Sequence, residues 1–335
     1  MTSIRISLLV LACAGALSAA DLAVYAIDVE GGKSTLFVSP SGESMLVDTG
    51  YDGLKGRDAA RILAATKAAG LKQIDYLVIT HYHHDHVGGV PQLAAQIPIK
   101  NFVDHGPNFE TTKDNAAVYK AYVAARKKGN HIVVKAGDRI PIRGLQVDVV
   151  TASGVAIAQP MPGGGQPNPA CASYHPIAED TGENAHSIGM VVKYGDFRLS
   201  DLGDLFWNQE HDLACPANKL GPVDVYLTTH HGKKTSNSPQ IVWALHPKVA
   251  IMNNGPTTGG SVQAWQTIHE SPGLMDLWQL HFATANGQPH NSSEDLIANT
   301  GSDSEHCKGN WILLTVHPDG GFTVQNGRTG FSKNY

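Results

Sequence analysis

Short apolar runs and segments of helical period alternate along most of the chain. Runs of apolar and β-branched residues between turn-forming residues predict strands at residues 22–29, 35–39, 44–48, 74–80, 99–104, 131–135, 145–151, 187–194, 197–200, 223–229, 248–252, 277–282, 311–316 and 322–325. Segments with a helical apolar period predict helices at residues 57–69, 88–97, 114–128 and 261–269. Because no linker interrupts this alternation, we predict one α/β domain over residues 21–335, with sheets packed between helices.

The segment 152–183 departs from this pattern. It is rich in proline, contains Gly163-Gly164-Gly165, and has few periodic apolar positions. A loop of this length in a compact enzyme is typically a lid or substrate loop, or else a disordered segment. Both interpretations are kept.

The first twenty residues have the pattern of a secretory signal peptide. Arg5 is their only charged residue, an apolar run follows it, and Ser18-Ala19-Ala20 offers small residues for cleavage near Asp21. A retained membrane anchor is the alternative, but the apolar run is short for a membrane span. We therefore expect an exported protein, located in the periplasm or outside the cell.

The net charge of the chain limits the classes of partner that it can attract. The formal net charge is −5, and a mildly acidic protein has no general attraction to nucleic acid or to an anionic membrane. No later apolar run is long enough to span a bilayer. We expect a small-molecule or short oligomeric substrate, no nucleic-acid binding, and no membrane association beyond export.

Three cysteines remain once Cys13 is removed with the predicted signal. Cys171, Cys215 and Cys307 can form at most one internal disulfide, which leaves one free thiol. An exported protein can form that bridge, but the sequence does not select the pair. None of them belongs to a CxxC motif, so a structural zinc site of that kind is not expected.

The densest polar pattern follows the predicted strand 74–80. His81, His83, Asp85 and His86 are all residue types that ligate metals, and Gly88-Gly89 comes directly after them. Residues two apart on an extended chain point the same way, so His81 and His83 can share one metal. The chain then turns, and Asp85 and His86 are expected to serve a second metal. An unmetallated cluster of this kind is costly to bury, which argues against a purely structural role.

Two later strand ends can complete a dinuclear site. Asp204 follows the strand 197–200, and its carboxylate has two oxygens with which to bridge two cations. Asp201 is the competitor, but the glycine before Asp204 allows a sharp exit from the strand. His230-His231 follows the strand 223–229, and only one of two adjacent residues normally faces a given side.

The segment Thr80–Gly89 resembles the signature of the metallo-β-lactamase superfamily of metal-dependent hydrolases. Further matches, in order along the chain, are similar to the hydrolase domains of ComEC-type bacterial competence proteins: Ile27–Lys33, Leu46–Gly50, Asn184 with Ser187, Leu202–Asp204 and Thr229–Gly232. The resemblance implies an αββα sandwich of two mixed sheets flanked by helices. It also implies metals at the edge of the sheets.

The resemblance also implies a ligand set. His81 and His83 would hold the first metal, Asp85, His86 and His230 the second, and Asp204 would bridge. Asp48 would be a buried carboxylate that supports the site. His230 is preferred over His231 because one residue separates it from the following glycine. Zinc, as two ions, is the default metal, with manganese and iron as alternatives.

One position departs from the family pattern. Many members have a further histidine for the first metal, shortly before the strand that leads to the bridging aspartate. Here the candidates are His186, which is shifted from that place, and His105, at the end of the strand 99–104. Either can instead support the site without touching metal.

The expected chemistry is hydrolysis by metal-bound hydroxide of a phosphodiester or of a carboxylic ester, lactone or lactam. Asp85, or a nearby histidine such as His105, would move the proton, and no GxSxG serine motif is present. Lys233 and Lys234 can receive an anion or form a solvated turn. Two other classes use the same ligands: an iron redox protein, and a metal-binding protein without turnover.

Overall fold

The computed structural model describes residues 20–110, 112–301 and 306–335. The predicted signal peptide lies outside these residues apart from Ala20. Two nine-stranded sheets dominate the chain. Both are mixed, with antiparallel strands at one side and parallel strands at the other.

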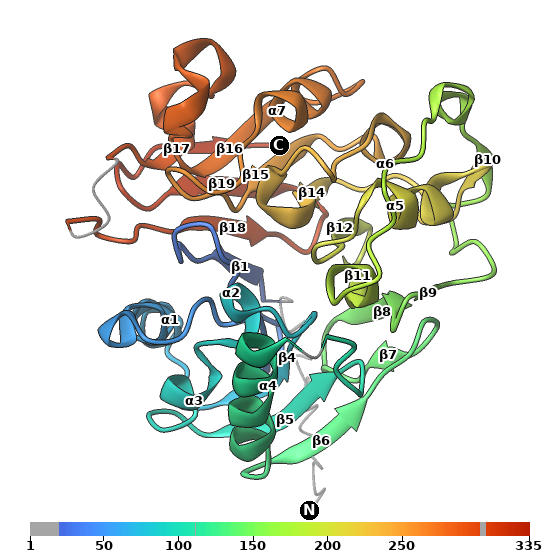
Figure 1. Cartoon of the computed structure of the whole chain (residues 1–335). Coiled ribbons are helices and arrows are strands. Elements are labelled where there is room, and N and C mark those ends of the chain that lie inside the picture. The colour runs from blue at the N-terminus through green and yellow to red at the C-terminus, as the bar shows by residue number, and fades with distance from the viewer. Residues whose placement is uncertain (1–19, 111, 302–305) are drawn as a thin grey trace, which may run out of the picture.

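The first sheet contains strands from both ends of the described chain. Its order is β20-β19-β18-β1-β2-β3-β4-β5-β6, and the run from β3 to β6 is parallel. The strands are β1 (Leu22–Ala26), β2 (Thr35–Val38), β3 (Ser44–Val47), β4 (Ile74–Val78), β5 (Ile99–Asp104), β6 (Asn130–Val133), β18 (Ile312–Val316), β19 (Phe322–Asn326) and β20 (Ser332–Asn334). Figure 1 shows the blue β1 beside the red β18.

The second sheet is built from the middle of the chain. Its order is β17-β16-β15-β14-β12-β11-β8-β7, with β9 paired to β8, and the run from β12 to β17 is parallel. The strands are β7 (Arg139–Ile140), β8 (Gln146–Ala152), β9 (Val155–Ala156), β11 (Gly189–Tyr194), β12 (Phe197–Asp201), β14 (Val225–Leu227), β15 (Val249–Met252), β16 (Asp276–His281) and β17 (Ile297–Asn299).

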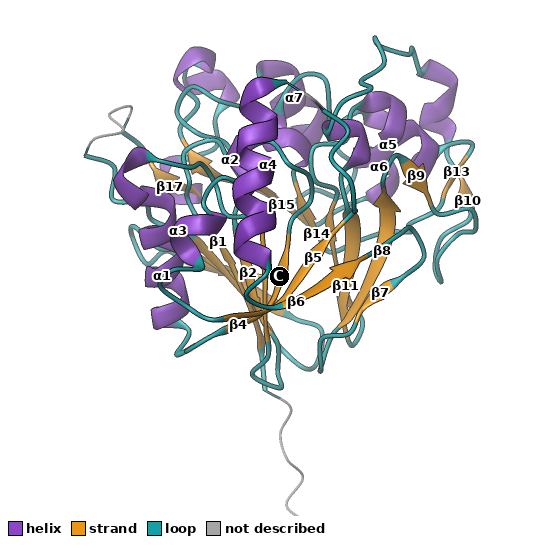
Figure 2. Ribbon diagram, turned by 60° about the horizontal axis from the view of Figure 1, so that its bottom comes forward, coloured by secondary structure: helices purple, strands orange, loops and turns teal. Residues whose placement is uncertain are grey.

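Helices cover the outer face of each sheet (Figure 2). The first sheet is covered by α1 (Arg57–Ala68), α2 (His84–Val87), α3 (Val90–Leu93) and α4 (Lys113–Arg126), and the second by α5 (Trp207–Ala214), α6 (Pro239–Leu245) and α7 (Val262–His269). Three apolar layers result: one between the sheets and one beneath each set of helices. The predicted αββα sandwich is therefore confirmed.

The alternation of side chains in β1 shows how the sequence builds two of these layers. Leu22, Val24 and Ala26 join the core between the sheets, whereas Tyr25 and Ile27 join the core beneath α1 and α4. Successive side chains of a strand point to opposite faces, so a strand that is apolar on both faces is buried on both. Such burial contributes about 25 cal/mol per Å² of apolar surface.

The predicted strands and helices are present with bounds that differ by up to four residues, and some short elements were not predicted. The unpredicted α5 and α6 span eight and seven residues, too few for a helical period to stand out. The helix predicted from residue 88 begins as α2, already at His84, and continues in α3. This early start matters because it places part of the histidine motif on a helical turn.

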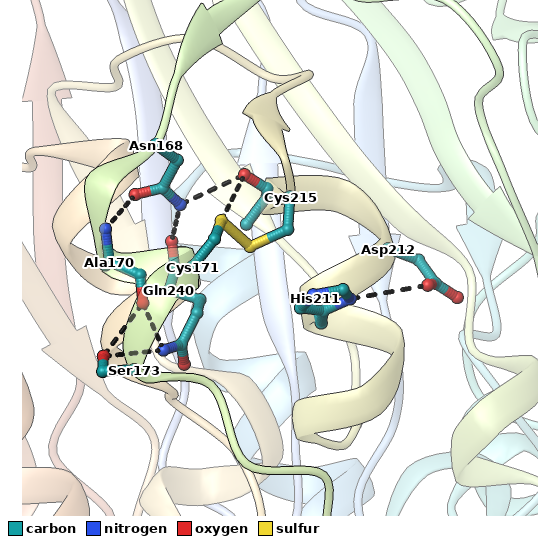
Figure 3. The surroundings of a disulfide bond; sticks show 9 residues. Asn168, Ala170, Cys171, Ser173, His211, Asp212, Cys215 and Gln240 are labelled. Carbon is teal, nitrogen blue, oxygen red and sulfur yellow. Dashed lines mark hydrogen bonds and ion pairs between the residues drawn. A yellow bond between two sulfur atoms is a disulfide. The ribbon is translucent and has the colours of Figure 1, made fainter.

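The segment 152–183 has a defined path. It contains β9, the short strand β10 (Gln166–Pro167), which pairs with β13 (Ala217–Asn218), and a 3-10 turn at Pro169–Ser173. A disulfide joins Cys171 to Cys215 at the end of α5 (Figure 3). Asn168 adds hydrogen bonds from its side-chain amide to the carbonyl oxygens of Ala214 and Gln240. The disordered alternative is therefore wrong, and the lid interpretation stays a prediction.

The disulfide leaves Cys307 as the free thiol that the odd cysteine count required. Across the residues that the structure describes, no helix combines the length and apolar character needed to cross a membrane.

Candidate metal centre

The histidine motif lies where β4 ends, at the edge that it shares with the parallel strand β3. Residues 79–83 are extended, and α2 then turns the chain from His84 onward. His81 and His83 point the same way, as expected, because Nε2 of His81 lies 3.0 Å from Nδ1 of His83. The turn of α2 brings Asp85 and His86 toward Asp204 and His231, with the His86 ring still 4.0 Å from the His81 ring. The assignment of the two pairs to two metals stays a prediction.

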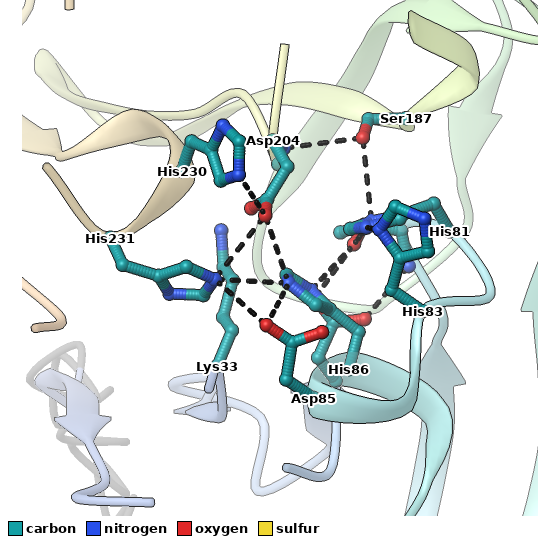
Figure 4. A network of polar contacts seen from close by, with 12 residues as sticks. Lys33, His81, His83, Asp85, His86, Ser187, Asp204, His230 and His231 are labelled. Carbon is teal, nitrogen blue, oxygen red and sulfur yellow. Dashed lines mark hydrogen bonds and ion pairs between the residues drawn. The ribbon is translucent and has the colours of Figure 1, made fainter. Parts of the chain in front are cut away.

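Four side chains converge beside α2: Asp85, His86, Asp204 and His231 (Figure 4). Nε2 of His86 lies 3.2 Å from Oδ2 of Asp204 and 3.2 Å from Nε2 of His231. Nε2 of His231 lies 3.2 Å from Oδ2 of Asp204 and 3.5 Å from Oδ2 of Asp85. Asp204 and His231 reach this point from the ends of β12 and β14, which are parallel neighbours.

This spacing fits a cation. Ligands about 2.1 Å from a tetrahedral zinc ion lie about 3.4 Å from one another, close to the separations found here. Among the described residues, Oδ1 of Asp204 is buried without a hydrogen-bond partner. A buried carboxylate oxygen is costly to leave unpaired, so a second cation on that side would satisfy it. The residues present therefore fit a metal centre with Asp204 at its middle.

The pKa values reflect the same concentration of negative charge. Burial favours the neutral form of every group, but the carboxylates of Asp204, Asp48 and Asp85 outweigh it and raise the pKa of His86 well above its usual value. The nearby histidines hold the pKa of Asp204 well below its usual range, again against burial. The carboxylates therefore stay ionised and attract positive charge to this point.

Asp48 supports the centre from behind, as the resemblance implied. Its Oδ2 lies 2.8 Å from Nδ1 of His86 and accepts a hydrogen bond of 2.7 Å from the Thr80 hydroxyl. Its Oδ1 accepts a hydrogen bond from the backbone N–H of Thr80. A carboxylate on Nδ1 orients the ring and leaves Nε2 directed at the centre.

The structure places His231, and not the preferred His230, among the four converging side chains. Both residues lie in a 3-10 turn, Thr229–Gly232, with left-handed backbone angles of φ 52° and 55°. The alternation expected of extended chain does not apply to such a turn. Nε2 of His230 lies 3.5 Å from Oδ2 of Asp204, but it also lies 3.0 Å from Nζ of Lys233. Burial, with a smaller effect of Lys233, lowers the pKa of His230 to about 3, against the pull of Asp204.

Neither His105 nor His186, the two candidates for a third ligand of the first metal, lies among the four converging side chains. Nε2 of His105 lies 3.1 Å from Oε2 of the buried Glu183. The His186 ring stacks on Phe109, and its Nδ1 lies 2.6 Å from the Gly182 carbonyl oxygen. Both rings are therefore held by contacts outside the converging group. A catalytic role for His105 stays a prediction.

Ser187 lies between the two parts of the centre instead. Its hydroxyl lies 3.4 Å from Nδ1 of His81 and accepts a hydrogen bond of 3.2 Å from the backbone N–H of Asp204. Figure 4 shows these contacts joining the His81 side to the Asp204 side. A hydroxyl is a weaker ligand than imidazole, so the His81–His83 pair is left with fewer strong donors than the opposite side.

Lys33 is a functional candidate that the sequence did not single out. Its side chain is 2% exposed and forms an ion pair with Asp201, whose side chain is fully buried. This pairing leaves Asp204, and not the competitor Asp201, free for the centre. The backbone N–H of Lys33 also donates to the Asp85 carbonyl oxygen at 3.0 Å. No local pattern around Lys33 indicates burial, because its partner is 168 residues away.

A cavity of about 500 Å³ lies beside His83, and none of the four converging side chains lines it. His83 and His84 line it on one side, and residues of α4 and the preceding loop line the other. Glu110 belongs to this lining, and its Oε1 lies 3.1 Å from Nε2 of His83. Asp52 and Asp114 add two further carboxylates. The sequence did not single out these acidic residues: Asp52 and Glu110 lie outside the predicted strands and helices, and Asp114 begins the predicted helix 114–128.

Comparisons with known proteins agree with this picture. The profile of the metallo-β-lactamase superfamily matches residues 27–166. ComE operon protein 3 of Bacillus subtilis is 26% identical over 243 residues, covering 68% of this chain and 28% of its own length. A hydroxyacylglutathione hydrolase of Aliivibrio salmonicida is 51% identical over 53 residues, which are 16% of this chain and 20% of that protein. The chain thus spans little more than a quarter of the first of these relatives.

Among solved structures, the metallo-β-lactamase fold protein YhfI of Bacillus subtilis superposes with a TM-score of 0.49 at 11% identity. The match covers 88% of this chain and 99% of that one. The profile match includes the histidine motif, which in the structure supplies Asp85 and His86 to the converging ligands. Residues 27–166 of this chain therefore match the metallo-β-lactamase superfamily.

Proposed function

We propose that this protein is an exported metal-dependent hydrolase that cleaves an ester-type bond in a small or short oligomeric substrate. The observation that carries the proposal is the convergence of Asp85, His86, Asp204 and His231 within 4.8 Å of one another. The side chain of Asp85 is 13% exposed, so the group reaches solvent on one side. A buried set of ligands with one open side is typical of a catalytic metal centre and not of a structural one.

Asp85, His86 and His231 would hold one cation, His81 and His83 a second, with Asp204 between them. Zinc fits this nitrogen and oxygen ligand set, and manganese or iron uses the same residue types. When bound, such cations make water a strong nucleophile near neutral pH and draw charge from the oxygen that becomes negative.

Asp85 is the residue that we assign to proton transfer. Among the four converging side chains it is the most open to solvent, whereas the side chain of Asp204 is 2% exposed. His231 and His86 hold its pKa well below the usual range, although burial acts in the opposite direction. An ionised carboxylate at the open side of the centre can take a proton from the attacking water and pass it to the leaving group.

The cavity beside His83 is the proposed substrate pocket. Its volume of about 500 Å³ suits a small molecule or one end of a short oligomer. The carboxylates of Asp52, Glu110 and Asp114 repel a polyanion. This favours neutral carboxylic derivatives, such as esters, thioesters, lactones or lactams, over phosphodiesters. The similarity of one segment to a protein named hydroxyacylglutathione hydrolase supports the same class.

Export is supported by the disulfide between Cys171 and Cys215, because such bonds persist in oxidising compartments. N-terminal sequencing of the protein from a cell fraction outside the cytoplasm tests this part. Cleavage near Asp21 is the expected result, and an uncleaved chain in the cytoplasm contradicts it.

The enzymatic test is a substrate screen on protein reconstituted with zinc, manganese or iron. The panel contains p-nitrophenyl phosphodiesters, p-nitrophenyl carboxylic esters, lactones and the β-lactam nitrocefin. Turnover that disappears in an Asp85→Ala/His86→Ala double variant supports the proposal. Unchanged turnover in that variant contradicts it.

Two further results would replace this function with another. Bound iron with visible absorbance and no hydrolysis indicates a redox protein. Metal bound at two ions per chain without turnover of any class indicates a binding protein.

A further inference from the structure

A second group of potential ligands lies apart from the candidate metal centre. It contains Asp28, His281 and Cys307, whose ligand atoms all lie within 4.8 Å of one another. Nε2 of His281 lies 2.8 Å from Oδ1 of Asp28, and the Cys307 thiol donates to Oδ2 of Asp28 at 3.4 Å. Asp28 and His281 are fully buried, and Cys307 is half-buried.

Three distant parts of the chain supply these side chains. Asp28 follows β1, His281 ends β16 in the other sheet, and Cys307 precedes β18 (Figure 1). The residues that contact Asp28 are 253 and 279 positions away from it. A group assembled in this way links the two sheets at one point. An ion held there would act as a cross-link over a very long loop of chain.

The net charge of the groups around Asp28 can be balanced by a divalent cation. Arg61 donates to Oδ2 of Asp28 at 3.0 Å and to Oε1 of Glu30 at 2.8 Å, and Arg57 pairs with Glu30 and Asp58. Three carboxylates and two guanidinium groups sum to one negative charge. With Cys307 as thiolate, the sum is two negative charges, which one divalent ion neutralises.

Cys307 also gives the group a connection to solvent. It lines a cavity of about 340 Å³ together with Asn299 and Asn310. The Oδ1 of Asn299 lies 3.8 Å from Sγ of Cys307, but it already accepts two hydrogen bonds from Asn310. The fourth position around an ion is therefore left to water from the cavity. The same cavity provides an entry path.

We propose that Asp28, His281 and Cys307 form a second metal site, separate from the candidate hydrolytic centre, which binds a zinc-class divalent ion. Sulfur, imidazole nitrogen and carboxylate oxygen are the three ligand types that zinc takes in proteins. A thiolate ligand disfavours magnesium and calcium, which require oxygen. The site is structural: it ties the β1–β2 loop, which carries both Asp28 and Lys33, to the opposite sheet.

Cobalt titration of the metal-free full-length protein tests this site apart from the other one. A cobalt–thiolate bond gives a near-ultraviolet charge-transfer band, and the histidine–aspartate centre contains no thiolate to produce it. Cys171 and Cys215 are joined in the disulfide and cannot contribute a thiolate to this band. The expected result is a band whose intensity at saturation corresponds to one thiolate-bound cobalt ion per chain, and zinc should displace it.

Variants assign the band to residues. Cys307→Ser and Asp28→Asn should abolish or strongly weaken it, whereas Asp204→Ala, in the other centre, should leave it unchanged. A band that survives in Cys307→Ser overturns the proposal, and so does cobalt binding without any band in the native chain.

A second measurement does not depend on a folded variant. Reaction of the native chain with a thiol reagent should be slowed at least tenfold by three equivalents of zinc, one for this site and two for the candidate hydrolytic centre. An unchanged rate overturns the proposal and leaves Cys307 as an ordinary half-buried thiol.

Discussion

The two ligand groups of this protein differ in how the chain assembles them. Asp85 and His86 are neighbours in one motif, and Asp204 and His231 join them from the ends of adjacent parallel strands. Asp28, His281 and Cys307 come instead from three separate segments in two sheets. The first group uses only nitrogen and oxygen ligands, whereas the second includes sulfur and is flanked by Arg61.

This difference shows what makes a site visible in a sequence. A motif can be read when its ligands are dense and lie at the carboxyl end of a buried strand, because backbone geometry then fixes their directions. A group whose members are brought together only by the packing of two sheets leaves no local trace. The two groups can therefore be distinguished by experiments that perturb one and spare the other.

The largest expected effect comes from Asp204→Ala. Removing the carboxylate shared by His86 and His231 should lower turnover at least ~1,000-fold, corresponding to about 4 kcal/mol in transition-state energy. Steady-state hydrolysis and metal content per chain are the measurements. Asp212→Ala, at a side chain 68% exposed on α5, is the matched control and should have full activity. Equal activity in the two variants would contradict the assignment of the centre.

The Lys33→Met variant tests how much the buried ion pair of the β1–β2 loop stabilises the protein. It leaves the buried Asp201 carboxylate without its cation, which should reduce the free energy of unfolding by about 3–5 kcal/mol. Denaturant unfolding with the disulfide intact measures the change. Lys100→Met is the control, since Lys100 pairs with Asp75 but is 55% exposed, and its loss should cost less than about 1 kcal/mol.

A double variant separates charge burial from packing in that loop. Lys33→Met/Asp201→Leu removes both charges and should regain much of the lost stability. If the single Lys33 and Lys100 variants are equally stable, the buried pair does not support the candidate centre.

The buried carboxyl of Glu210 predicts that the free energy of unfolding depends on pH. Burial raises the pKa of Glu210 from 4.5 to about 7, even though it accepts hydrogen bonds from the backbone N–H groups of Asn237 and Ser238. The folded state thus binds this proton more tightly than the unfolded state. The stability gained is present below pH 4.5 and is lost as the pH rises through about 7, a change of about 3 kcal/mol.

Glu210→Gln should flatten the stability profile across that window relative to the native chain. Unfolding curves at several pH values measure it, with Glu270→Gln at an exposed position as the control. Parallel profiles for the native chain and the Glu210 variant would show that this carboxyl does not titrate in the window.

The smallest effect is expected from Arg61→Met, which acts on the second group. Removing the guanidinium beside Asp28 takes away a positive charge that opposes a bound cation. Cobalt affinity at the thiolate band should therefore rise about tenfold, or about 1.4 kcal/mol. Spectroscopic titration measures it, and Arg139→Met, at an exposed pair on the far sheet edge, is the control. Weaker binding in Arg61→Met would show that Arg61 positions the ligands more than it repels the ion.

The sequence predicted the strands and the first half of the candidate centre for a common physical reason. Alternation in strands such as β1 and the ligand spacing in 81–86 are both consequences of local backbone geometry. The structure departs from the predictions where geometry is locally unusual. His231 takes the place expected for His230 because both residues adopt left-handed angles, which a two-residue alternation does not anticipate.

Contacts between distant segments were beyond the reach of sequence patterns. The pairing of Lys33 with Asp201, and the position of Glu110 beside His83, depend on how separate loops pack against each other. The choice of Cys171 and Cys215 as the disulfide pair depends on the path of the segment 152–183 in the same way. Ser187 at the place where a third histidine was sought is a further example.

The pairing of β1 with β18 has a consequence for how the molecule is made. Leu22 is in register with Val316, so one edge of β1 stays unpaired until the chain has been synthesised through residue 316. Such a long-range strand pair is slow to form and exposes a template for aggregation while it waits. The sheet that carries the histidine motif is thus completed only after β18, β19 and β20 have been made. A chain that must wait for this pairing stays incompletely folded for longer than a chain whose strands pair with near neighbours. An incompletely folded chain is the state in which a polypeptide passes through a translocation channel.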